Sequence, residues 1–153
     1  GYVVVPWRGS LDAMQPVGAN VGDQITLIGY DLVGDLVPGE TLNVTLYWEA
    51  HRSLADSEAT YFVFVHVLDS DGQLVTQHDG APVEGHYPIQ AWIPGETVRD
   101  VHPVTFNPQL PPGTYRLQVG MYQRSTMERL PAWDKDGNEL ANGVIVLQSL
   151  EIR

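Results

Sequence analysis

The sequence contains no cysteine and little positive charge, and both shortages exclude whole classes of function. Without cysteine the chain forms no disulfide and no thiolate metal site, and its compartment cannot be read from its thiols. The formal net charge is −11, and the basic side chains are one lysine, Lys135, and seven dispersed arginines. A surface that binds nucleic acid or anionic lipid needs clustered lysine and arginine. We therefore expect neither nucleic acid nor an anionic membrane surface as a partner.

Long apolar runs and targeting signals are missing as well. No run approaches the about 20 apolar residues that span a bilayer, so we expect no direct insertion into a membrane. The chain opens with Gly1, Tyr2 and Val3, without a start methionine or a charged leader. This start predicts a piece of a longer exported or membrane-anchored parent. Its 153 residues suit a single domain.

The sequence also lacks the common catalytic and metal-binding motifs. It has no Gly-x-Ser-x-Gly, no His-Glu-x-x-His, no phosphate loop and no Gly-x-Gly-x-x-Gly, so we predict no catalytic residues, no cofactor and no enzyme. The segments 69–72 and 134–138 begin like calcium loops, but glycine stands fourth in them instead of sixth. We interpret both as hairpin turns and predict no metal site, with weak calcium binding as the less favoured alternative.

What the sequence does contain is the alternation of β-strands. Residues 41–50 alternate cleanly between apolar and polar, which indicates a half-buried antiparallel strand. Residues 61–68 are apolar on both faces, which predicts a central strand covered on both sides, or a strand that lies under a loop or a partner. The pattern predicts no helix and a loop over 53–60. Further strands are expected at residues 24–30, 74–79, 97–106, 114–122 and 144–152.

Turn and breaker residues refine this pattern. Pro103 cannot donate to a ladder, so its strand is predicted to lie at an edge or to carry a bulge. The last strand changes phase, which predicts a β-bulge near Gln148 and Ser149. Asp-Gly pairs at 71–72 and 136–137 predict two hairpins with type I′ turns.

The segment from Leu110 to Tyr115 decides the fold class. Its Leu-Pro-Pro-Gly-Thr-Tyr sequence leads into a strand and looks like a tyrosine corner, in which the Tyr115 hydroxyl binds backbone upstream. We therefore predict an all-β, two-sheet antiparallel sandwich with Greek-key connections, of immunoglobulin-like or jelly-roll strand order. Residues 21–153 would form this domain. Residues 1–20 would add an N-terminal strand at 2–6 and a connection at 8–20.

Polar residues inside predicted strands form one candidate cluster. His66 lies within an apolar run, Asp79 follows on the hairpin-paired strand, and Asp100 and His102 share a face of a later strand. If these strands are neighbours, His66, Asp79 and Asp100 are expected to form one buried structural network, because satisfied polar groups specify a core.

The aromatic residues supply the candidate binding site. Tyr87 and Trp92 flank a proline-bounded loop, and exposed rings of this kind stack on sugars while a carboxylate such as Asp79 binds their hydroxyls. The alternative is that Trp92 closes the end of the core, and we favour it. Trp7 and Trp133 carry the same ambiguity, whereas Trp48 is predicted to be core.

The order and spacing of these motifs resemble a known domain type. It is the β-sandwich domain at the C-terminal, extracytoplasmic end of bacterial membrane glycosyltransferases of the dolichyl-phosphate-mannose mannosyltransferase type, common in Chloroflexi-like bacteria. The resemblance covers nearly the whole chain after about Asn20. It rests on Gly22-Asp23-Gln24-Ile25, Leu27-Ile28-Gly29-Tyr30, Pro38-Gly39, Leu46-Tyr47-Trp48, Phe62-Val63-Phe64-Val65-His66-Val67-Leu68-Asp69, Asp71-Gly72, Gln77-His78-Asp79-Gly80, Tyr87-Pro88, Trp92-Ile93-Pro94-Gly95-Glu96, Leu110 to Tyr115, Val119-Gly120-Met121-Tyr122 and Arg129-Leu130-Pro131.

The resemblance implies a location outside the cytoplasmic membrane and a non-catalytic accessory role near glycans. The expected partner is the remainder of the parent membrane protein, in a structural or protein-interaction role. The alternative is a carbohydrate-binding module that recognises a glycan or glycolipid head group through the aromatic loop.

Overall fold

The chain forms two antiparallel sheets packed face to face. The computed structural model describes residues 14–153. Every paired strand among them is antiparallel, and three short 3₁₀ segments interrupt the connections. The elements are β1 (Gln15–Val21), β2 (Ile25–Val33), β3 (Thr41–Ala50), β4 (Tyr61–Leu68), β5 (Leu74–Gly80), η1 (Pro82–Gly85), η2 (Ile89–Ala91), β6 (Val98–Thr105), β7 (Gly113–Gln123), β8 (Ala132–Trp133), β9 (Glu139–Leu140), η3 (Ala141–Gly143) and β10 (Ile145–Ile152).

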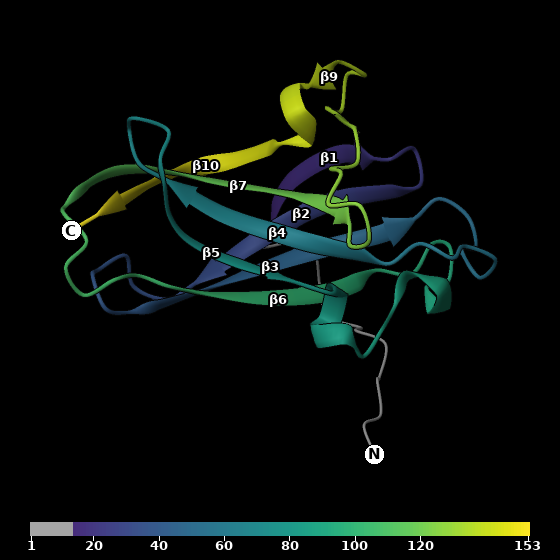
Figure 1. Cartoon of the computed structure of the whole chain (residues 1–153), viewed down its shortest axis with the longest axis horizontal. Helices are drawn as coiled ribbons and strands as arrows, with labels where there is room; N and C mark the ends of the chain where they lie inside the picture. Colours follow the sequence, from purple (N-terminus) through teal and green to yellow (C-terminus); the bar gives the residue numbers. More distant parts are fainter. Residues whose placement is uncertain (1–13) are drawn as a thin grey trace.

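The strand order is that of an immunoglobulin-like sandwich. One sheet runs β6-β3-β2-β1-β8-β9 and the other β10-β7-β4-β5. The chain crosses between the sheets after β3, β5, β6, β7 and β9 (Figure 1). In immunoglobulin notation, β2, β3 and β6 correspond to strands A, B and E, and β5, β4, β7 and β10 to C′, C, F and G. The structure thus decides between the two predicted strand orders.

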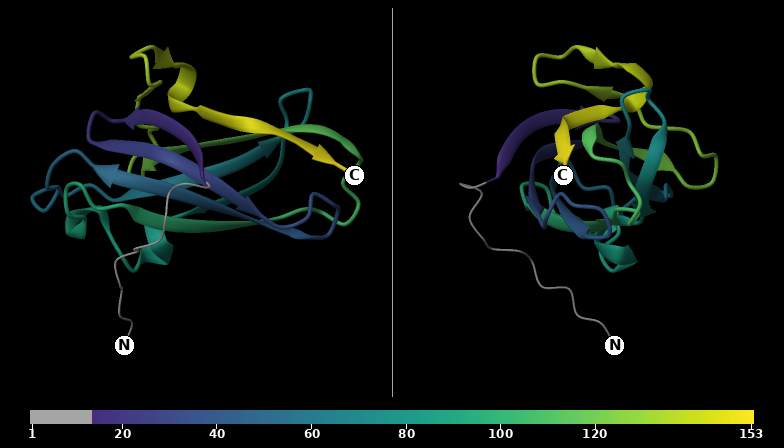
Figure 2. Two further views of the ribbon diagram at one scale, coloured as in Figure 1. Left: turned by 180° about the vertical axis from the view of Figure 1, so that it is seen from behind. Right: turned by 90° about the vertical axis from the view of Figure 1, so that its left-hand side faces the viewer.

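The core lies between the sheets. Along each central strand every second side chain points inward, and the view along the strands shows the two layers enclosing this space (Figure 2). The largest side chains that are fully buried there include Trp48, Trp92, Phe106, Leu46, Leu117 and Leu150. The prediction that Trp48 is core is confirmed.

The predicted strands are found, and one strand was missed. Residues 41–50 and 61–68 match β3 and β4 in both bounds, and the other predicted strands agree within three residues at each end. The prediction of a connection over residues 8–20 is wrong from Gln15 onward, because β1 occupies Gln15–Val21 and pairs with β2. Only Ala19 and Val21 of β1 are buried, and Pro16 and Gly18 break its alternation, so the sequence signal is weak. The predicted strand at residues 2–6 lies outside the described residues.

The two breaker predictions are confirmed. Pro103 lies in β6, which is the edge strand of its sheet. The bulge in β10 falls between Val146 and Gln148, slightly earlier than predicted. Tyr30 stabilises it, because its hydroxyl donates to the Leu147 carbonyl at 3.2 Å and to Oε1 of Gln148 at 2.7 Å.

Both Asp-Gly hairpins form, but their turn type differs from the prediction. A type I′ turn needs positive φ at two central residues, whereas only Gly72 and Gly137 have it, at 79° and 84°. In each turn the first aspartate caps the backbone: Oδ1 of Asp69 accepts the amides of residues 71 and 73, and Oδ1 of Asp134 those of residues 136 and 138. These aspartates therefore favour a turn with one left-handed glycine.

The tyrosine corner is present at the start of β7. The hydroxyl of Tyr115 donates to the carbonyl of Pro111 at 2.6 Å, and the ring is buried. This contact fixes the crossing from β6 to β7, as in other immunoglobulin-like sandwiches.

Replacing Tyr115 by phenylalanine is expected to lower the free energy of unfolding by about 1–2 kcal/mol, because the ring stays and only its hydrogen bond is lost. Urea denaturation of both proteins measures this difference. Tyr61→Phe, which removes a hydroxyl from a longer 3.3 Å hydrogen bond to Gln24, is the matched control. A Tyr115 variant as stable as wild type would contradict a structural role for the corner.

Candidate functional site

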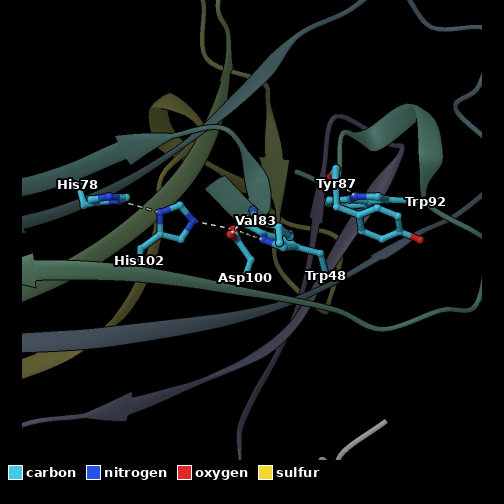
Figure 3. Close-up of polar contacts among 7 residues, drawn as sticks. All are labelled: Trp48, His78, Val83, Tyr87, Trp92, Asp100 and His102. Atoms are coloured by element: carbon cyan, nitrogen blue, oxygen red, sulfur yellow. Dashed lines mark hydrogen bonds and ion pairs between the residues drawn. The ribbon is translucent and has the colours of Figure 1, made fainter. Parts of the chain in front are cut away.

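A buried carboxylate, Asp100, organises the interior polar groups. The inward face of β6 carries Val98, Asp100, His102 and Val104, so the alternation of the strand places two polar side chains in the core. Asp100 is fully buried, and its oxygens accept Nε1 of Trp48 at 3.1 Å and the amide of Val83 at 2.7 Å. Figure 3 shows these groups converging on the carboxylate.

A pair of histidines extends this cluster across the gap between the sheets. Nε2 of His102 contacts Oδ2 of Asp100 at 2.6 Å, and Nδ1 of His102 lies 2.9 Å from Nδ1 of His78 (Figure 3). His102 comes from β6 and His78 from β5, the adjacent edge strands of the two sheets. Burial, followed by the neighbouring His102, lowers the pKa of His78, so its neutral form is favoured. The contact between the two Nδ1 atoms ties the two sheets together.

The Asp100 cluster, made of Asp100, His102, His78, Trp48 and the Val83 amide, is suited to a structural role. Asp100 and His102 are 0% and 1% exposed, so a substrate in solvent does not reach them. The cluster also holds η1, where Val83 has φ 53°, an unfavourable backbone conformation for a β-branched residue. The amide of Val83 donates to Asp100, and this bond offsets part of that strain.

The sequence analysis missed Trp48 as a partner of Asp100. A usable signal was present, because Asp100 and His102 share one face of their strand with valines.

The aromatic loop belongs to the core. Trp92 is 2% exposed, and its Nε1 donates to the Tyr87 carbonyl at 2.9 Å. Tyr87 is half-buried and donates its hydroxyl to Glu96. Burial and that hydrogen bond raise the pKa of Tyr87 to about 12. The predicted stacking pair therefore offers no exposed Trp92 face, and Asp79 lies elsewhere, so the structure does not bring the three predicted ligand-binding residues together.

The predicted network of three residues is divided between two places. His66 and Asp79 lie on the outer face of the β10-β7-β4-β5 sheet, with Nε2 of His66 3.4 Å from Oδ1 of Asp79. Asp100 lies inside, with Trp48 and His102. Neighbouring residues of a strand face opposite ways, so His78 points inward and Asp79 outward. The sequence analysis grouped the three residues on the condition that their strands are neighbours, and it did not separate the two faces of each strand.

A polar pocket of about 220 Å³ surrounds His66 and Asp79. Its floor is the ring of Phe64, which lies over Gly120 of the paired strand. A Cβ on Gly120 would stand 2.4 Å from Cζ of Phe64, so glycine is needed there. The remaining lining residues are Gln77, Tyr122, Met127 and Arg129.

The loop after β7 forms one wall of this pocket. Residues 128–130 run beside the last residues of β7, where Arg129 pairs with Tyr122 and the Leu130 amide donates to the Met121 carbonyl. The Arg129 guanidinium then lies over the Phe64 ring, with Cζ 4.5 Å from its centroid. This cover over β4 confirms the prediction that residues 61–68 form a central strand with both faces covered.

The electrostatics of the pocket are mixed. Burial lowers the pKa of His66, more than the nearby Asp79 carboxylate raises it, so the neutral imidazole is favoured. Burial and the Asp79 carboxylate raise the pKa of Tyr122, which keeps its hydroxyl protonated. The pocket therefore contains one cation, Arg129, one anion, Asp79, and neutral groups between them.

The lowered pKa of His66 predicts a pH dependence of stability. The unfolded chain binds a proton at this histidine near its ordinary pKa of 6.5, whereas the folded chain binds it only at lower pH. The stability that the neutral His66 contributes to the fold is therefore fully present above about pH 6.5 and is lost as the pH falls below that value. Urea denaturation between pH 7.5 and 5 is expected to show a shallower loss of stability in His66→Gln than in wild type. A steeper loss in the variant would contradict the assignment.

A second hollow has a volume of about 400 Å³. It is bounded by β1, the β8–β9 hairpin and the start of β10, and its lining is mostly apolar. Its apolar residues include Val17, Ala19, Leu140, Ile145 and Val146, of which Val146 is 55% exposed. Trp133 in that hairpin is half-buried. Trp7 lies outside the described residues.

Residues 14–153 offer neither a cluster of side chains suited to a metal ion nor a helix suited to span a membrane. No group of three or more His, Asp or Glu side chains in this part is arranged to hold a metal ion. No helix in the same range combines the length and the hydrophobicity needed to cross a membrane.

Comparison with known proteins adds no identity to this geometry. No protein-family model matches the chain, and no curated protein sequence matches it. The functional argument therefore rests on the residues and the fold.

Proposed function

We propose that this chain is a non-catalytic accessory module of a larger cell-envelope protein, in which it has a structural or protein-interaction role. The burial of Trp92 carries the proposal, because the loop with the strongest sequence signal for binding closes the core instead. The parent is a membrane glycosyltransferase, and the module lies outside the cytoplasmic membrane. The resemblance of the motifs from Asn20 onward supports this placement.

The interior polar groups support a role without catalysis. An acid–base site needs a titratable group within hydrogen-bond reach of a substrate. Asp100 and His102 are instead committed to Trp48, Val83 and His78 and are closed to solvent. Recognition of a glycan through Tyr87 and Trp92 is the weaker alternative, since Trp92 offers no free face.

A cysteine-labelling experiment tests the location. The chain has no cysteine of its own, so Asp71→Cys in the exposed turn after β4 gives a single thiol in this domain. In intact cells that express the full natural protein, a membrane-impermeant maleimide is expected to label this thiol. Labelling only after the membrane is permeabilised would contradict an extracytoplasmic position.

A deletion experiment tests the role. The full natural protein and a version that lacks residues 14–153 are compared for sugar transfer per enzyme molecule and for their amount in the membrane. We expect unchanged transfer and a reduced amount, because an accessory module acts on the assembly and not on the reaction. Catalytic turnover by the isolated chain, or loss of transfer at an unchanged amount of enzyme, would overturn the proposal.

A further inference from the structure

The pocket around His66 and Asp79 is built into the sheet and is not a gap between loose side chains. Its floor, Phe64, is held between Gly120 below and the Arg129 guanidinium above. His66, Gln77, Asp79 and Tyr122 come from β4, β5 and β7, three adjacent strands of one sheet, whereas Arg129 and Met127 come from the loop after β7. Side chains on paired strands keep their spacing without a ligand, so these groups are already in position to bind one.

One buried polar atom in the pocket lacks a partner. Nε2 of His66 is shielded from solvent and has no hydrogen-bond partner among the described residues. Its nearest charged neighbour is Oδ1 of Asp79 at 3.4 Å, which is an ion-pair contact when the imidazole is protonated. Buried polar atoms are normally paired, and leaving one unpaired is costly. The side chains around the pocket therefore do not fully satisfy one another's hydrogen bonds.

The lining of the pocket selects for a neutral ligand that both donates and accepts hydrogen bonds. Arg129, Gln77 and Tyr122 supply donors, whereas Asp79 and the Gln77 amide oxygen supply acceptors. Asp79 and Arg129 carry opposite charges, so the pocket has no net charge that would favour an anion over a cation or the reverse. Met127, which is 63% exposed, adds an apolar surface. A sugar residue has this combination, because its hydroxyls donate and accept while its C–H faces are apolar.

We propose that this pocket binds one neutral sugar residue, with Asp79 and Gln77 holding its hydroxyls and Met127 contacting an apolar face. The volume of about 220 Å³ is below the about 300–1,000 Å³ of pockets that enclose drug-sized ligands, so it admits one residue of a glycan and not several. The site uses Asp79 of the predicted binding residues and does not involve Tyr87 or Trp92. It is independent of the accessory role, which the labelling and deletion experiments test separately.

An NMR titration tests the site. The ¹⁵N-labelled chain is titrated with the methyl glycosides of mannose, glucose, galactose and N-acetylglucosamine. At least one is expected to give saturable shifts of the amides of Gln77, Asp79 and Arg129, with a dissociation constant of about 1–10 mM, since a single residue makes few contacts. Methyl glucuronide and glucosamine serve as anionic and cationic comparisons and are expected to bind more weakly.

Matched variants decide whether the pocket is responsible. Asp79→Asn replaces an ionised acceptor by an amide and is expected to weaken binding about tenfold. Gln77→Ala is expected to weaken it to a similar degree. Asp71→Asn makes the same chemical change in a distant exposed turn and is expected to leave the affinity unchanged. Absence of saturable shifts with all four neutral glycosides, tighter binding of a charged sugar, or unchanged affinity in both pocket variants would overturn the proposal.

Discussion

Asp100→Asn is expected to lower the free energy of unfolding by about 3–5 kcal/mol, the range found when one partner of a buried polar network is removed. The carboxylate accepts hydrogen bonds at both oxygens, from Val83 at one and from Trp48 and His102 at the other. An amide keeps the shape but turns one of these acceptors into a donor. The buried donor that faced this oxygen, either Val83 or the pair Trp48 and His102, then faces the new NH₂ group and loses its acceptor.

Thermal and urea denaturation measure this effect. In a chain of this size, the change corresponds to a fall in Tm of about 6–20 °C. Asp71→Asn is the matched control, because the same substitution at an exposed turn is expected to stay within about 0.5 kcal/mol of wild type. If the two variants were equally stable, the Asp100 cluster would not be a structural centre of the fold.

Trp92→Ala is expected to have an effect of similar size, about 3–5 kcal/mol, because it empties a core position that is 2% exposed. It also leaves the Tyr87 carbonyl without the donor Nε1 of Trp92. A tryptophan that only served as an exposed stacking platform would behave like an ordinary surface residue, within about 0.5 kcal/mol.

Denaturation of Trp92→Ala therefore separates the two interpretations of the aromatic loop. Tyr87→Phe in the same loop is the control: it keeps the ring and removes the hydrogen bond to Glu96, which is expected to cost about 1 kcal/mol. Stability of Trp92→Ala near that of wild type would show that the loop does not close the core. Near-ultraviolet circular dichroism reports whether the tryptophan environment is lost in the folded variant.

The strands could be predicted from local pattern because each central strand buries one face or both. Period-two alternation marks β3, and apolar residues on both faces mark β4. β1 escaped prediction because only two of its residues are buried and a proline and a glycine interrupt it. Its strand conformation comes from pairing with β2, which is a contact at the tertiary level.

The candidate sites could be predicted only in part. His66, Asp79 and Asp100 were recognised as polar residues within strands, and the structure places the first two in one sheet and Asp100 in the other. Whether two such residues meet depends on the register of strand pairing and on the face of the sheet to which each side chain points. Asp79 and His78 differ by one position, and for that reason they lie on opposite faces of the sheet. The His78–His102 contact joins two sheets, and no spacing within one strand encodes it.

By itself, the order of residues determined a cysteine-free, acidic β-sandwich with a tyrosine corner, an edge strand at Pro103 and a bulge in the last strand. These features follow from local rules of alternation, ring geometry and missing amide donors, which act within a few residues. Only the folded structure decided that Trp92 closes the core, that Asp100 joins Trp48, and that Phe64 forms the floor of a polar pocket. Such contacts join residues far apart in the chain, and their geometry is fixed only when the two sheets pack.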